Sequence, residues 1–208
     1  MRAAVLWGIS LSIYAGFFAW YTNLSGPLTG PEIEARLQLM RASNAAPERI
    51  ALVEAFMRSD TGDDFIMVNL LDMNEAPPVL PATGSNADAD DLMDHYMEHM
   101  YRELMVRASH PVFFGQAVAD AMDIQGIVDG SHWERAGLVR YRSRRDLVDI
   151  ALDPRFRERH DYKVGALAKT IAFPVQPSLH TGDPRLLLAL LLIALTAVIH
   201  LVAVRRKG

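Results

Sequence analysis

The sequence predicts an α+β domain between two membrane-spanning helices. Two uncharged stretches of 19 residues lie near the ends of the chain, and strand-like and helix-like patterns alternate between them. At 208 residues, the chain has room for one ordinary domain with appendages. An apolar content of 50% excludes a mostly disordered chain, and the absence of cysteine excludes a disulfide scaffold or a thiolate site.

The first uncharged stretch, Ala3 to Tyr21, predicts a transmembrane helix over residues 1–22. Nineteen helical residues extend about 28 Å, close to the thickness of the hydrocarbon core of a bilayer. A cleaved signal peptide is the alternative, but no A-x-A cleavage site follows the apolar stretch. Gly8, Ser12 and Gly16 form a stripe along which a helix of another membrane protein can pack, although small residues are common in membrane helices.

The second uncharged stretch, Leu186 to Val204, predicts a transmembrane helix over residues 185–204, followed by a basic tail at 205–208. Basic residues flank the outer ends of both helices, which favours two cytoplasmic termini and an extracytoplasmic domain on the inner membrane. His200 then lies near the membrane interface. With the four flanking basic residues set aside, 17 basic residues stand against 25 acidic ones, which argues against nucleic acid as a partner.

Residues 23–60 are expected to form a linker and two short helices. Asn23 to Pro31 is uncharged and contains Gly-Pro steps, as is typical of a linker. Pro31–Met40 and Ala46–Met57 then carry apolar residues at helical spacing.

Residues 61–178 are expected to form the α+β domain. Four runs have strand-like composition: Phe65–Leu71, Pro111–Ala119, Trp133–Tyr141 and Lys169–Val175. An amphipathic helix over Asp90–Arg107 separates the first two, and helix-start signals at Ser143 and at Asp153-Pro154 precede the last strand. The order strand, helix, strand, strand, helix, strand is that of a ferredoxin-like βαββαβ domain, an antiparallel sheet with helices on one face.

Several segments of this domain resemble a known family. They are VNLLDM at Val68–Met73, the helix with Tyr96 and Met97, HPVFFG at residues 110–115, and WERAGLVRYRSRRDLVDIALDPRF at Trp133–Phe156. Over Phe65 to Val175 the chain resembles the dimeric α/β-barrel superfamily, and within it the domain of unknown function 1330 group. The resemblance implies a homodimer in which two sheets face each other, with a cleft between sheet and loops. Relatives include cofactor-free monooxygenases and isomerases, but no catalytic motif of theirs matches here.

The candidate ligand-binding residues are Asn69, Tyr96, His132, Trp133, Arg140 and His160. Arg140 suits a carboxylate or phosphate because its guanidinium can bind either through two hydrogen bonds, and Asn69 with His132 or His160 could complete an anion site. The alternative is that the arginines of this region pair with nearby acidic side chains.

His95-Tyr96-Met97-Glu98-His99 reads H-x-x-E-H, a zinc-peptidase spacing, but the domain is too small to supply the third ligand such enzymes need. We interpret the motif as a solvated helix face and expect no metal site; His95 and His99 are only weak candidates. The sequence also contains no Gly-rich phosphate loop and no GxSxG elbow, so we expect no cofactor and no assembled catalytic set.

These observations favour a binding or assembly module, a subunit or accessory of a membrane complex. The alternative is a cofactor-independent oxygenase or isomerase, which a deep apolar cavity closed around convergent polar residues would favour. We expect a homodimer formed through the sheet, because helices can cover only one apolar sheet face. In the competing arrangement, the two leading helices cover the second face and the domain stays monomeric.

Overall fold

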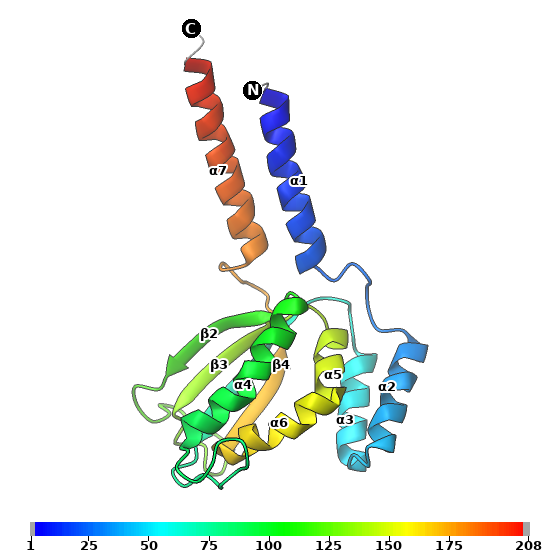
Figure 1. Ribbon diagram of the computed structural model, residues 1–208, viewed down its shortest axis with the longest axis vertical. Coiled ribbons are helices and arrows are strands. Elements are labelled where there is room, and N and C mark those ends of the chain that lie inside the picture. The colour runs from blue at the N-terminus through cyan, green and yellow to red at the C-terminus, as the bar shows by residue number, and fades with distance from the viewer. Residues whose placement is uncertain (1–2, 206–208) are drawn as a thin grey trace. The chain divides into compact units, whose positions relative to one another are not determined.

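The computed structural model describes residues 3–205 and divides the chain into two compact units (Figure 1). One unit, Met1–Leu24 with Pro177–Gly208, contains helices α1 (Ala3–Tyr21) and α7 (Pro184–Arg205). The other unit, Ser25–Gln176, contains all remaining helices and strands. Arg2 and the predicted tail after Arg205 lie outside the described residues.

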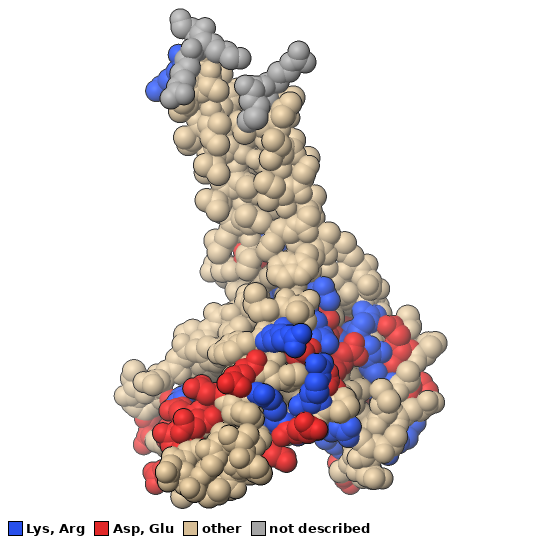
Figure 2. Space-filling model, in the orientation of Figure 1, with Lys and Arg blue, Asp and Glu red and all other residues tan. Residues whose placement is uncertain are grey.

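Helices α1 and α7 are both long and apolar enough to cross a membrane. They contact each other through polar groups: the hydroxyls of Ser10 and Thr196 lie 2.6 Å apart, and Trp7 Nε1 donates to His200 Nδ1 at 3.4 Å. Charged side chains gather on the α+β unit (Figure 2). Among the described residues, no atom outside the adjacent turns of α1 lies within 4 Å of where a Cβ would stand at Gly8 or Gly16, so the described part of α7 does not cover the predicted packing stripe.

The α+β unit contains one sheet of four strands, in the order β2-β3-β1-β4 with every neighbouring pair antiparallel. The strands are β1 (Phe65–Met73), β2 (His110–Gln116), β3 (Arg135–Tyr141) and β4 (Leu167–Val175). The four predicted strands are therefore present. The second ends earlier than expected and the third begins later, because a loop from 117 to 134 connects them.

Three helices cover one face of this sheet: α4 (Ala89–Val106), α5 (Arg144–Leu152) and α6 (Pro154–Gly165) (Figure 1). Both predicted helix starts are confirmed, since Ser143 Oγ accepts from the Asp146 amide at 3.0 Å and Asp153 Oδ1 from the Arg155 amide at 2.8 Å. Each such cap contributes roughly 1 kcal/mol. The main core lies between helices and sheet and includes Phe65, Leu92, Tyr96, Leu104, Tyr141 and Ile150.

The two leading helices, α2 (Gly30–Ala42) and α3 (Pro47–Arg58), pack against α5. Their apolar side chains form a second core with Val148 of α5, and Arg145 of α5 forms an ion pair with Glu32 at 2.7 Å. The hydrogen bond from Arg145 holds the pKa of Glu32 down at about 2. The boundary expected at residue 60 therefore falls inside one compact unit.

The position of α5 also decides whether the leading helices cover the second sheet face. Ile150 of α5 belongs to the main core with Phe65 and Tyr141, so α5 lies on the helix-covered side. Because α2 and α3 pack against α5, the competing arrangement, in which they cover the opposite sheet face, does not occur.

The strand register assigns side chains to the two sheet faces. Phe65, Met67, Asn69 and Leu71 of β1 alternate with Ile66, Val68, Leu70 and Asp72. The first set points toward the helices, since Phe65, Met67 and Leu71 pack in the main core. The second set, with the cross-strand partners Arg140, Leu138 and Ala136, forms what we call the free face.

Candidate functional site

A cavity of about 440 Å³ lies between the helix-covered face of the sheet and α4. Apolar side chains of α4 and the sheet provide most of its wall, including Leu71, Met93, Met97, Met100, Leu104, Phe114 and Val139. A second cavity of about 250 Å³ extends toward α3 and α5, where Val53, Phe56, Leu147 and Phe156 line it. Asn69, Tyr96, Met100, Tyr141 and Lys163 line both cavities, so the two adjoin.

Four polar groups from four elements meet at this junction: Asn69 of β1, Tyr96 of α4, Tyr141 of β3 and Lys163 of α6. The Asn69 amide nitrogen donates to the carbonyls of Met67 and Gly137 at 3.2 and 3.1 Å, which leaves its oxygen as an acceptor. Within residues 3–205, the two tyrosine hydroxyls and the Lys163 ammonium form no hydrogen bond or ion pair. Lys163 instead lies 5.8 Å from the centre of the Tyr96 ring.

The electrostatics of the junction follow from its apolar surroundings. Burial lowers the pKa of Lys163, and the nearby charge of Arg49 lowers it further. Burial also lowers the pKa of His160, which lines the second cavity, with additional contributions from Lys163 and Arg49. Burial raises the pKa of Tyr96 and of Tyr141, so both phenols stay protonated. The junction therefore offers hydroxyl donors, an amide acceptor and a lysine whose charge is poorly solvated.

The structure brings together three of the six predicted ligand-binding residues. Asn69, Tyr96 and His160 all line the second cavity. Tyr141 and Lys163 were missed, although alternation in the WERAGLVRY run places Tyr141 on the same face as Val139. The only signal for Lys163 was one cation between the apolar positions Tyr162 and Val164, which gives no indication of a cavity.

The expectation that Arg140 shares a site with Asn69 is wrong. Asn69 pairs across the sheet with Gly137 and Arg140 with Ile66, so the two side chains lie on opposite faces. Arg140 is 2% exposed; its Nε donates to Asp64 Oδ2 at 2.7 Å and one terminal nitrogen donates to the Ala108 carbonyl at 2.8 Å. The alternative of pairing with an acidic side chain applies to this arginine.

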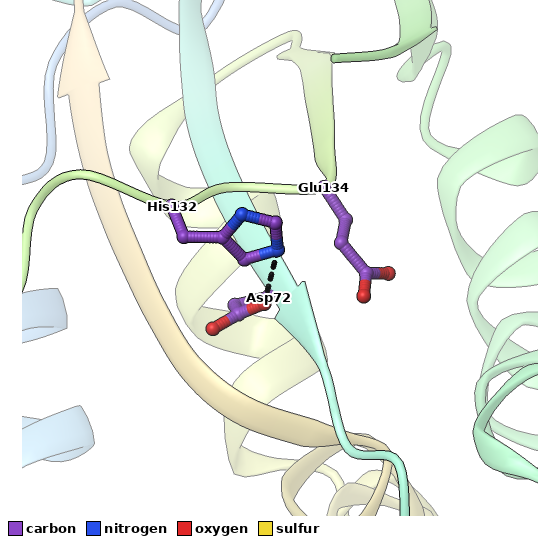
Figure 3. Close-up of side chains that lie close together, drawn as sticks. All are labelled: Asp72, His132 and Glu134. Atoms are coloured by element: carbon purple, nitrogen blue, oxygen red, sulfur yellow. Dashed lines mark ion pairs between the residues drawn. The ribbon is translucent and has the colours of Figure 1, made fainter. Parts of the chain in front are cut away.

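His132 and Trp133 line neither of these two cavities. They lie in the loop before β3, beside a separate surface pocket. Trp133 Nε1 donates to the Gly130 carbonyl at 2.9 Å, and Lys169 Nζ lies 5.0 Å from the centre of its ring. His132 instead lies beside Asp72 and Glu134, and the ligand atoms of these three side chains lie within 4.8 Å of one another (Figure 3).

The H-x-x-E-H segment lies on α4, and its histidines are less exposed than expected. The His95 ring lies 4.3 Å from the Tyr162 ring, and Arg159 donates to the His95 carbonyl at 2.6 Å and to Glu98 at 3.1 Å. His99 Nε2 is buried and has no hydrogen-bond partner in the described part of the chain. The prediction of a solvated face therefore holds for Glu98, whereas both histidines are half-buried.

Comparison with protein-family models gives no match, and comparison with curated proteins gives none. Two solved structures of a protein called RPA0582 are similar to this chain. The structure of the methylated protein has 20% identity and a TM-score of 0.53, covering 66% of this chain and 95% of its own. The other, described as a protein of unknown function from Rhodopseudomonas palustris, has 18% identity and a TM-score of 0.51, covering 65% and 95%. At this identity the similarity concerns the fold, and an α+β sheet fold fits both proteins.

Proposed function

We propose that this protein is a membrane-anchored binding module whose α+β domain holds a small, mostly apolar molecule with an anionic or carbonyl group. The observation that carries the proposal is the cavity of about 440 Å³, with an apolar wall and unpaired polar groups at one junction. Ligand sites in proteins are concave and mostly apolar, with a few polar groups that orient the ligand. In this role the module serves as a subunit or accessory of a membrane complex.

The proposal includes a ferredoxin-like domain of the dimeric α/β-barrel type. The strand order β2-β3-β1-β4, antiparallel throughout, supports this topology, because each helical connection skips one strand. Helices on one sheet face leave the other face for a second copy, and the cavity on the helix side remains free for a ligand.

The polar groups define the chemistry of the ligand. The ammonium of Lys163 lies among apolar side chains and lacks a carboxylate partner among residues 3–205, so an anionic group on the ligand would stabilise its charged form. The hydroxyls of Tyr96 and Tyr141 can donate to the same group. A carboxylate, an enolate or a polarised carbonyl on an aromatic or aliphatic body fits this arrangement.

Replacing Lys163 with methionine is expected to weaken binding of 1-naphthoate about 10- to 100-fold, because a hydrogen bond to a charged group contributes roughly 1.5–3 kcal/mol. Binding of the neutral analogue 1-naphthamide should change far less. The measurement is titration calorimetry with the full chain in detergent. Partitioning of the probe into micelles is then the same for the unchanged chain and for Lys163→Met. Equal affinity of the unchanged chain and Lys163→Met for naphthoate, or no saturable binding of either probe, would contradict the proposal.

A second candidate function is proton transfer by a cofactor-independent isomerase or oxygenase. Lys163 favours it, since a lysine whose pKa is lowered by burial can act as a base toward a carbon acid held by the tyrosine hydroxyls. Lys163→Arg separates the two functions, because arginine keeps the charge but does not act as a base. Both functions predict that this variant still binds naphthoate. Only the enzyme function predicts that the variant loses the turnover of a bound carbon acid that the unchanged chain catalyses.

We also propose that α1 and α7 anchor the domain in the inner membrane with both termini in the cytoplasm. Alkaline phosphatase fused after Pro177 should be active, because it folds only outside the cytoplasm, and the same enzyme fused after Gly208 should be inactive. The basic residues flanking the helices motivate this orientation. Phosphatase activity in the reverse pattern would place the domain in the cytoplasm. In the proposed arrangement, the stripe of Gly8, Ser12 and Gly16 is left open by α7 and is available to a helix of another membrane protein.

A further inference from the structure

The geometry points to a binding site for a divalent transition-metal ion, formed by Asp72, His132 and Glu134 on the side of the sheet opposite the cavities (Figure 3). Asp72 alternates with Leu71, which lines the first cavity, so Asp72 projects from the free face. One imidazole nitrogen and two carboxylate oxygens lie within 4.8 Å of one another, close enough to bind a single ion.

The backbone holds the two carboxylates side by side. Glu134 immediately precedes β3, and its amide donates to the Leu71 carbonyl at 3.0 Å, while its carbonyl accepts from Ala117 at 2.7 Å. Leu71 and Arg135 are the last paired residues of β1 and β3, so Asp72 and Glu134 both lie immediately beyond the end of this ladder, where their carboxylates are close together. Two like charges held this close on neighbouring strands repel each other, and a cation between or beside them offsets the repulsion.

The imidazole is oriented by a neighbour outside the set of three. His132 Nδ1 lies 2.9 Å from Asp120 Oδ1, whereas its Nε2 faces Asp72 Oδ1 at 3.6 Å (Figure 3). Histidine ligands of metals commonly hold a carboxylate on the other ring nitrogen, which fixes the ring and makes the free nitrogen more basic. Asp120 occupies this position here.

Lys169, the cation beside Asp72, does not take the position that a metal ion would occupy between Asp72 and His132. Lys169 Nζ lies 3.6 Å from Asp72 Oδ2, and it donates to the Asp129 carbonyl at 2.6 Å. Lys169 therefore contacts the other oxygen of Asp72, away from the one that faces His132. The Glu134 carboxylate has no hydrogen bond or ion pair with any of the described side chains, and only the longer-range charges of His132 and Arg135 act on it.

The donor set indicates the class of ion. Imidazole combined with carboxylates suits zinc and neighbouring first-row metals, whereas magnesium and calcium prefer oxygen ligands alone. Three protein ligands leave at least one coordination position for water or another ligand, as in catalytic rather than structural zinc sites.

Zinc binding to the full chain in detergent tests this inference. After treatment with a chelator and its removal, the chain should bind one zinc ion per molecule by equilibrium dialysis, and Glu134→Gln should weaken binding at least about 10-fold. Glu134→Gln is the principal variant because Glu134 has no hydrogen bond or ion pair to lose among the described residues, so without zinc its thermal unfolding temperature should be no lower than that of the unchanged chain. Asp120→Asn should keep one ion per molecule with affinity about 10- to 100-fold lower, since Asp120 positions a ligand without being one.

The double variant His95→Ala/His99→Ala serves as the control, because it removes the other two histidines that the sequence offers for a metal. This variant should bind zinc like the unchanged chain. Absence of stoichiometric zinc, zinc retained at full affinity in Glu134→Gln, or zinc lost in the control variant would each overturn the site. Magnesium added in place of zinc should not bind, and magnesium binding of equal strength would also contradict the assigned ion class.

Discussion

Replacing Arg140 with methionine is expected to lower the free energy of unfolding by about 3 kcal/mol. The Arg140 guanidinium is 2% exposed and satisfies both Asp64 and the Ala108 carbonyl. Removing it takes a buried hydrogen-bond donor away from the Asp64 carboxylate and from the Ala108 carbonyl. Asp64 keeps 20% of its surface exposed, so the effect falls at the lower end of the range for buried pairs.

Thermal unfolding of the full chain, followed by near-ultraviolet circular dichroism, measures this effect. Arg58→Met is the matched control, because Arg58 is 57% exposed and its ion pair with Glu54 at 2.6 Å should contribute well under about 1 kcal/mol. In Arg140→Met/Asp64→Asn the second change removes the carboxylate charge that Arg140 otherwise faces, so about 1 kcal/mol or more should be recovered. If Arg140→Met and Arg58→Met lower the free energy of unfolding by the same amount, the buried contacts of Arg140 stabilise the fold no more than an exposed ion pair does.

The misassignment of Arg140 shows where local patterns fail. Strands and helices depend on spacing within a segment, so FIMVNLL and the capping residue Ser143 were sufficient to place β1 and the start of α5. The role of Arg140 depends on Asp64 and on a carbonyl 32 residues earlier, and no spacing within β3 encodes that contact.

The same reasoning explains why only two of the four polar residues at the cavity junction, Asn69 and Tyr96, were among the predicted ligand-binding residues. Both lie in segments whose local spacing indicates a strand and a helix. Lys163 lies on α6 and becomes a cavity residue only because α6 packs beside α4. Docking of α2 and α3 on α5 was also unpredictable, because their apolar stripes permit more than one packing partner.

Leu138→Glu is expected to convert a dimeric protein into monomers, because Leu138 lies on the central strand β3 and faces the side of the sheet that the domain's helices leave open. Large apolar side chains remain exposed on this face: Phe113 at 52%, Phe173 at 44% and Ile171 at 36%. Isolated exposed apolar residues are ordinary, but a contiguous apolar patch on a sheet marks an interaction surface.

A second copy of the same face is the partner we propose. Each copy of a standard interface buries about 800 Å², which at roughly 25 cal/mol per Å² exceeds the cost of association. In a two-fold dimer every substitution occurs twice, so a buried glutamate that costs at least about 2 kcal/mol per copy weakens the dimer by about 4 kcal/mol, or roughly 1000-fold. The carboxylate stays in water in the monomer, so the fold should survive.

Sedimentation equilibrium of the full chain at tens of micromolar, in density-matched detergent, tests the change in mass. Leu52→Glu is the control, because Leu52 of α3 is 71% exposed and lies far in sequence from the sheet. The unchanged chain and the control should be dimers, and Leu138→Glu should be a monomer. If Leu138→Glu remains a dimer, the membrane helices and not the sheet hold the two copies together. If the unchanged chain is a monomer, the proposed sheet-to-sheet dimer is contradicted.

Cross-linking in membranes then identifies the contacting surface, because the chain has no cysteine and a single introduced thiol reacts alone. Cysteine is placed in turn at Phe113, Leu138 and Phe173, on β2, β3 and β4 of the free face, and at Leu52 and Val164 on exposed helical positions as controls. At least one of the three free-face thiols lies near the two-fold axis and should give a covalent dimer with a short bis-maleimide, whereas the controls should not. Equal yields at free-face and helical positions would mean random collisions and would exclude a dimer built on the sheet.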